Sequence, residues 1–276
     1  MKKIMLLASV CLMLNNHALL AQTAGGGTKK TSAKKEAHTY SARLANSNDS
    51  RIIITMYNSD VQIVGTNSDE VTIESSSYTP PPARAAGLKP LYNQAEDNTG
   101  LGLAIIKENN TLRINKASRQ GGDYVIRVPR NAAVVYQEAN WMNGDFALAD
   151  TNGEVELKLN NGSATLTNIT GPVVANTTSG DITVKFSSLN QTKPSAISNV
   201  AGTVDITLPA NTKADFKLKT IQGEVYTDFD MNLAKSSQSD LTKIAGGNTI
   251  NGKTNGGGVE MSVYTVSGDV FIRRSK

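Results

Sequence analysis

The sequence contains very few of the residues on which most catalytic and metal-binding sites depend. Its 276 residues include one cysteine, two histidines and one tryptophan. Beyond residue 21 there is no cysteine, and the single histidine is His38. Histidine-based nucleophilic centres and zinc sites both need His or Cys side chains held between rigid partners. We therefore expect no catalytic residues, metal site, cofactor or disulfide, and we predict that the protein is not an enzyme.

Long apolar runs are also missing, apart from a short one near the N-terminus. Met1-Lys2-Lys3 precedes an apolar run from Ile4 to Leu14, and Ala21 supplies a small residue soon afterwards. These features are typical of a secretory signal peptide, and the run is too short to span a bilayer. We predict a signal peptide over residues 1–21, with lipoprotein processing at Cys11 as the alternative. The product is then exported to the periplasm or cell surface of a bacterium, with no transmembrane segment.

Charge of one sign is scarce once the N-terminal region is set aside. The chain has 28 basic and 24 acidic residues, and six of the lysines but only one acid lie within residues 1–37. Residues 22–37 combine Gly25-Gly26-Gly27 with four lysines, which predicts a flexible basic leader. This leader is either a solvated tether or a loose attachment to anionic envelope polymers. With no basic stripe in the remainder and aromatic residues at 5%, we expect no nucleic-acid partner.

What the sequence does contain is a glycine repeat. Gly144, Gly153, Gly162, Gly171 and Gly180 follow one another at intervals of nine residues. In each block the second and fourth residues after the glycine are apolar or alanine. A fixed period indicates one small unit stacked many times, because each unit needs neighbours to bury its apolar side.

Two all-β folds agree with this pattern. In a β-solenoid, a single-stranded β-helix-like stack, each block is a short strand and a glycine corner where positive φ is needed. In an antiparallel β-meander or sandwich, the Asn-Gly pairs at 143–144, 152–153 and 161–162 form two-residue turns. We favour the solenoid, since Thr170 and Ser179 replace the asparagine in the last two blocks. The predicted domain covers residues 38–276.

A longer duplication is also present. Val125–Asn131 and Val204–Asn211 are each a strand ended by proline, with asparagine two residues later. Glycine followed by an acidic or polar residue and an apolar residue recurs further on, and the spacing of 21 between Gly202 and Gly223 predicts a full coil or two short rungs. The predicted structural glycines are Gly144, Gly153, Gly162, Gly171, Gly180, Gly202, Gly223 and Gly268.

A Pro-rich loop over residues 75–102 interrupts the repeat. Its Pro80-Pro81-Pro82 cannot lie in a central strand, and a loop of this length is either functional or mobile. The predicted ligand-contacting residues are Tyr78, Arg84, Tyr92 and Trp141. The alternatives are exposed loop residues for the first three and edge packing for the tryptophan.

These features together resemble a known family. The strand–proline motif at Val128-Pro129, the recurrent glycine units, Asn255–Val259 and the ending Val266–Ile272 are similar to the bacterial "putative adhesin" β-strand-repeat domain. The likeness covers roughly residues 40–276. It implies a β-solenoid-like, non-enzymatic, exported domain of unknown biochemical role, and it brings no catalytic or ligand residues.

We therefore expect an envelope scaffold or binding module whose partner is an envelope or host polysaccharide, or a protein. One alternative is a polysaccharide hydrolase or lyase, which would need a converging pair of carboxylates. Another is an accessory component of envelope-stress signalling. Calcium is not expected, because each block offers at most one acid beside its glycine, as at Asp145, Glu154 and Asp181.

Overall fold

The computed structural model describes residues 38–44, 49–93, 95–142, 144–233 and 249–276. The predicted signal peptide, Cys11 and the basic leader lie outside these residues. The described part of the chain is almost entirely β-structure in two mixed sheets, which confirms the all-β, solenoid-like prediction. No helix within these ranges is long and apolar enough to cross a membrane.

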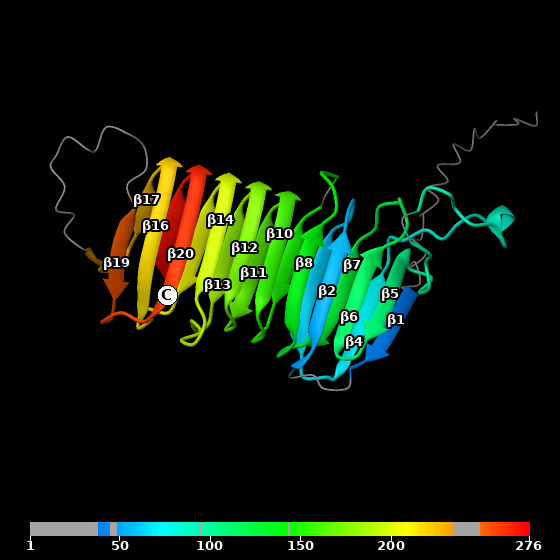
Figure 1. The fold of residues 1–276 in the computed structure, drawn as a ribbon, viewed down its shortest axis with the longest axis horizontal. Helices are drawn as coiled ribbons and strands as arrows, with labels where there is room; N and C mark the ends of the chain where they lie inside the picture. The colour runs from blue at the N-terminus through cyan, green and yellow to red at the C-terminus, as the bar shows by residue number, and fades with distance from the viewer. Residues whose placement is uncertain (1–37, 45–48, 94, 143, 234–248) are drawn as a thin grey trace, which may run out of the picture. The chain divides into compact units, whose positions relative to one another are not determined.

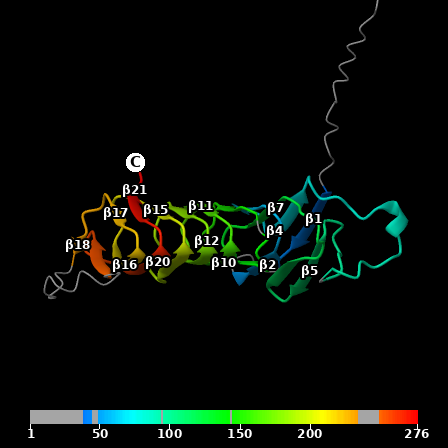
Figure 2. The ribbon, with the colours of Figure 1, turned by 90° about the horizontal axis from the view of Figure 1, so that it is seen from above.

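The two sheets face each other across the core (Figures 1 and 2). Sheet A, as described, runs in the order β1 (His38–Arg43), β4 (Glu70–Ser75), β7 (Tyr124–Pro129), β3 (Val61–Thr66), β9 (Phe146–Ala149), β11 (Ala164–Ile169), β13 (Ile182–Phe186), β15 (Val204–Leu208), β21 (Val270–Arg274) and β17 (Val225–Thr227). Sheet B runs in the order β18 (Asn232–Leu233), β19 (Ile250–Thr254), β16 (Ala214–Gln222), β20 (Val259–Ser267), β14 (Ser195–Ala201), β12 (Val173–Ser179), β10 (Val155–Asn161), β8 (Ala133–Glu138), β2 (Arg51–Met56), β6 (Thr111–Lys116) and β5 (Leu103–Glu108). A 3-10 helix, η2, spans Ala83–Ala85.

Each coil of the central stack takes one strand from each sheet. Strands of neighbouring coils are parallel, and partners lie 18 residues apart, as in Phe146 with Ala164 and Ala164 with Ile182. The nine-residue glycine period is therefore half a coil, one strand and one corner. Because side chains alternate between the two faces of a strand, every second residue points inward, and Leu157, Leu166 and Val184 are all fully buried.

The antiparallel meander is wrong for this region. It would fold the chain at Asn152-Gly153 and place Leu148 opposite Leu157. Instead, Leu148 lies in sheet A beside Leu166, and Leu157 lies in sheet B beside Ala175. The chain turns into the opposite sheet at each glycine rather than back along the same one.

The repeat glycines form two columns, one at each edge of the stack. The column at which chains pass from sheet B to sheet A contains Gly144, Gly162, Gly180, Gly202, Gly268 and Gly223 in spatial order, and the opposite column contains Gly153 and Gly171. A Cβ on most of these glycines would lie within 2.9 Å of a backbone carbonyl oxygen in the neighbouring coil. Close approach of stacked backbones is thus the common reason for glycine here.

The prediction that these corners need positive φ is only partly right. Gly180, Gly202, Gly223 and Gly268 have φ between 116° and 150°. The earlier repeat glycines, Gly144, Gly153, Gly162 and Gly171, are not among the residues with positive φ. At those four positions glycine is required by the neighbouring coil and not by its own backbone conformation.

The acidic residue after a corner glycine also has a structural role. The Thr203 amide donates to Asp181 Oδ1 at 2.7 Å, and the Glu224 amide donates to Asp269 Oδ1 at 2.9 Å. In each case a carboxylate accepts a backbone N–H from the adjacent coil, which would otherwise lack a partner at the corner. Within the described ranges, no three His, Cys, Asp or Glu side chains are grouped to hold a metal ion.

The coils do not stack in sequence order. The coil β2–β3 lies between β6–β7 and β8–β9, and the coil β20–β21 lies between β14–β15 and β16–β17. Gly202 therefore stacks on Gly268, not on Gly223, so the spacing of 21 residues spans a skipped coil. The two strand–proline motifs mark these skips: after Pro129 and after Pro209 the chain turns into sheet B and leaves room for one coil.

Antiparallel strands close both sheets at one end of the described stack and sheet B at the other, where the parallel strand β17 is the last described strand of sheet A. At one end β1 pairs with β4 and β5 pairs with β6, and at the other β19 pairs antiparallel with β16. Capping strands of this kind limit the open edges through which parallel stacks would otherwise add further chains.

Candidate functional site

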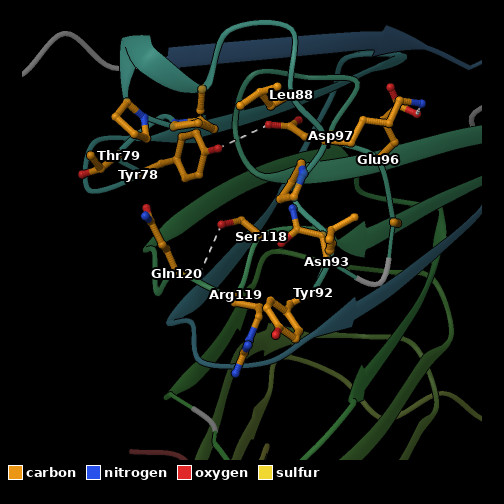
Figure 3. A pocket seen from close by; sticks show the side chains of 17 residues that line it. Tyr78, Thr79, Leu88, Tyr92, Asn93, Glu96, Asp97, Ser118, Arg119 and Gln120 are labelled. Carbon is orange, nitrogen blue, oxygen red and sulfur yellow. Dashed lines mark hydrogen bonds and ion pairs between the residues drawn. The ribbon is translucent and has the colours of Figure 1, made fainter.

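A hollow of the described chain lies under the Pro-rich loop between β4 and β5. Figures 1 and 2 show this loop extending beyond β1 and β5. The loop and the β6–β7 corner enclose a groove of about 820 Å³. We call it the loop groove; its principal lining residues, several of them shown in Figure 3, are Tyr78, Pro82, Leu88, Leu91, Tyr92, Asp97 and Arg119.

The rim of the loop groove is apolar and unusually exposed. Leu88, Leu91 and Tyr92 have 71%, 91% and 80% of their surface accessible. Arg119 lies over the Tyr92 ring, with its guanidinium carbon 5.5 Å from the ring centroid, which is cation–π distance. Large apolar side chains gathered at one exposed concavity are typical of a surface that contacts a partner.

Asp97 fixes the return half of the loop. Its Oδ1 accepts the amides of Thr99 and Gly100, at 2.9 Å and 3.0 Å, and its Oδ2 accepts the Gly102 amide at 2.8 Å. Burial tends to raise the pKa of Asp97, but the hydrogen bonds from Thr99, Gly102 and Gly100 outweigh it, so the pKa lies below its usual value. The Tyr78 hydroxyl, 3.4 Å from Oδ2, also donates to this carboxylate.

Replacing Asp97 with asparagine is expected to loosen the loop without unfolding the stack. The amide cannot accept on both sides, so at least one backbone N–H loses its partner, at a cost of about 1–3 kcal/mol. Hydrogen exchange should speed up at Thr99, Gly100 and Gly102 while β10 and β12 stay protected. The Asp97 contribution in the native chain should fade as pH falls toward its lowered pKa. Unchanged exchange at these amides would contradict the assignment.

A buried lysine lies beneath the loop. Lys116 is 2% exposed, and its Nζ donates to the Tyr124 hydroxyl at 2.6 Å; that hydroxyl donates in turn to Leu101 O at 2.8 Å. The Nζ also lies 4.5 Å from the Tyr124 ring centroid. Burial lowers the pKa of Lys116 to about 8, although Asp97 and Asp123 act in the opposite direction. Burial also raises the pKa of Tyr124.

The four predicted ligand-contacting residues occupy different positions. Tyr78 and Tyr92 both line the loop groove, but Tyr78 is buried as part of its wall, at 3% exposure. Arg84 is exposed on η2 and does not line the groove. Trp141 is 62% exposed at the β8–β9 corner, also away from the groove.

The sequence analysis missed Asp97, Lys116 and Arg119. Asp97 begins an Asp-Asn-Thr-Gly stretch, a turn signal that could have been found. Lys116 follows Leu112 and Ile114 at alternate positions of one strand, so its inward direction could have been predicted from the period of two. Arg119 carried no such signal, because its place beside Tyr92 depends on how two loops meet.

The chain is thus an all-β, solenoid-like stack with a groove formed by one long loop. The chain belongs to the family described as Toastrack DUF4097, which matches residues 51–273. That range begins with β2 and ends within β21, so it includes both inserted coils.

Two solved structures are also similar to the chain. One, described as a putative cell adhesion protein from Clostridium sporogenes, is 10% identical, with a TM-score of 0.45 over 87% of this chain and 99% of the other. Another, a putative adhesin from Bacteroides fragilis, is 12% identical, with a TM-score of 0.41 over 87% and 98%. No curated protein matches the chain.

Proposed function

We propose that this chain is an exported, non-catalytic binding module of the bacterial envelope, and that its loop groove holds an apolar segment of a protein partner. The observation that carries the proposal is the exposure of Leu88, Leu91 and Tyr92 around one groove of about 820 Å³. A few large side chains, most often Trp, Tyr and Arg, supply most of the binding free energy in protein recognition, and Tyr92 and Arg119 lie together at this groove. The stack of coils serves as the rigid support for this loop.

The carboxylates at the groove favour binding over acid–base chemistry. Both Asp97 oxygens accept backbone hydrogen bonds, and its pKa is lowered, so it stays ionised at neutral pH. Glu96 pairs with Lys89 at 3.4 Å, and both side chains are largely exposed. A glycosidase needs one carboxyl with a raised pKa to act as the acid, and the pKa of Asp97 is shifted in the opposite direction.

A polysaccharide is the second candidate ligand, supported by the Tyr92 ring. A sugar could stack on the face of the Tyr92 ring, which has Arg119 beside it. Its hydroxyl groups could form hydrogen bonds with the side-chain amides of Asn93 and Gln120 in the same lining. A sugar ligand does not account for the leucine and proline side chains of the lining, such as Pro82, Leu88 and Leu91. We therefore place the protein partner first.

Binding to bacterial envelope fragments tests the proposal. The mature chain should bind untreated fragments, lose binding after the fragments are digested with protease, and bind at least tenfold more weakly when Leu91 and Tyr92 are both replaced by serine. Both side chains are exposed, so the double variant should keep its melting temperature.

Trp141→Ser provides the matched control, because Trp141 is a similarly exposed aromatic outside the groove. It should bind as the native chain does. Binding that survives protease but is still weakened by the double substitution would favour the polysaccharide. Binding that is unaffected by the double substitution would contradict any role for the groove.

A further inference from the structure

The C-terminal coil occupies a slot between two coils that are consecutive in the chain. β20 pairs with β14 on one side and β16 on the other, and β21 pairs with β15 and β17. Its partners in β16 and β17 lie 45 residues earlier in the chain, as in Ala214 with Val259 and Val225 with Val270. In the described structure, β20 and β21 therefore make their ladders only with strands remote in sequence.

This coil is the element that joins the last part of the stack to the rest. β16 pairs with β20 and β19, and β17 pairs with β21, so the ladders that reach β14 and β15 pass through residues 259–274. The chain itself crosses the slot through the turn in which the Thr212 amide donates to Pro209 O at 3.0 Å. The slot is thus bounded by strands on both sides and by a proline turn along one edge.

The slot selects the segment that fills it. Met261, Val263, Thr265, Val270 and Ile272 point inward and are buried. Gly268 enters the glycine column, where a Cβ would lie 2.0 Å from Gly202 O. A filler must therefore be two short strands with alternating apolar residues and a glycine at their corner. Residues 259–274 of any copy of this chain meet all three conditions.

We propose that the slot is a strand-accepting site for a second copy of this chain, and that residues 259–274 are exchanged between copies. Insertion within one chain and between two chains makes the same ladders and buries the same side chains. The balance between them is then set by concentration. Exchange would join copies at the envelope and multiply the loop grooves available to a partner, which strengthens binding through multivalency.

Mixed cysteine variants of the full chain test this exchange. Ala196 in β14 and Ser262 in β20 are direct neighbours across the slot. One chain carries Ala196→Cys, the other carries Ser262→Cys, and both carry Cys11→Ser so that no other thiol is present. After incubation together at high concentration and oxidation, we expect a disulfide-linked heterodimer, which forms only when the coil of one copy enters the slot of the other.

Lys158→Cys mixed with Asn176→Cys is the matched control, because these residues are neighbours in β10 and β12, away from the slot. The slot pair should give at least tenfold more heterodimer than this control, increasing with concentration. Equal yields from the two mixtures, or none from the slot pair, would overturn the proposal. The Ala196→Cys, Ser262→Cys double variant should close within one chain, and its failure to do so would overturn the register on which the slot depends.

Discussion

Replacing Gly171 with alanine is expected to destabilise the protein by about 3 kcal/mol or more, because overpacking against backbone cannot be relieved by rotating a side chain. A Cβ at Gly171 would lie 1.9 Å from Gly153 O and 2.7 Å from Asn152 O. The backbones of two coils would have to separate at that corner. The Val155 amide donates to Pro172 O at 2.9 Å across the same contact, so separation also weakens the ladder.

The measurement is the free energy of unfolding by urea, with the melting temperature as a second readout. Gly87→Ala is the control: Gly87 has φ of 77° and no atom within 4 Å of an added Cβ. Alanine there meets only the conformational penalty of about 1 kcal/mol. A Gly171 variant no less stable than the Gly87 variant would show that the coils are not held at the spacing described.

Replacing Lys116 with methionine is expected to stabilise the protein at pH 7, by about 2 kcal/mol, since removing a poorly compensated buried charge often does so. Lys116 is 2% exposed, and among the described residues its hydrogen-bond acceptor is the Tyr124 hydroxyl. Methionine has a similar length and needs no acceptor. The Tyr124 hydroxyl keeps its own hydrogen bond to Leu101 O.

The stability difference between the native chain and Lys116→Met should also change with pH in a defined direction. Burial lowers the Lys116 pKa from 10.5 to about 8 in the folded chain. Between these values the unfolded chain binds more protons, so the stability of the native sequence should rise with pH from about 8 to about 10.5. The advantage of Lys116→Met should therefore shrink over that window.

Unfolding free energies of the native chain and the methionine variant at pH 7 and pH 10 provide the test. Lys185→Met, at an exposed position of β13, is the control and should show neither the stabilisation nor the change with pH. A Lys116 variant less stable than the native chain at pH 7 would mean that Tyr124, Asp97 and Asp123 together compensate the buried charge fully, and would contradict the prediction.

Part of the candidate site was readable from the sequence. Three consecutive prolines predicted that the segment between residues 75 and 102 leaves the sheet, and Tyr78 and Tyr92 proved to line one groove. The roles within the groove were not readable. Tyr78 is fixed in the wall by Asp97, and Tyr92 is stacked against Arg119 from the β6–β7 corner. Both contacts join segments whose meeting depends on the folded loop.

The sequence by itself determined the half-coil. Glycine every nine residues, with apolar residues two and four positions later, is enough to place Leu157 and Leu166 inside and to mark each corner, because side-chain direction along a strand is a local property. It also marked Pro129 and Pro209 as special strand ends.

Only the tertiary structure decided which coils are neighbours. Nearly all the coils present the same alternation and a corner glycine, the coil β2–β3 with Asn58-Ser59 at its corner being an exception, so the pattern does not specify one stacking order. Ladders between strands 45 residues apart, such as β16 with β20, depend on the packing of the whole stack. For the same reason, the period could not predict that β2–β3 and β20–β21 are inserted between other coils. The duplicated strand–proline motif, at Pro129 and Pro209, nevertheless lies at both places where a coil is inserted.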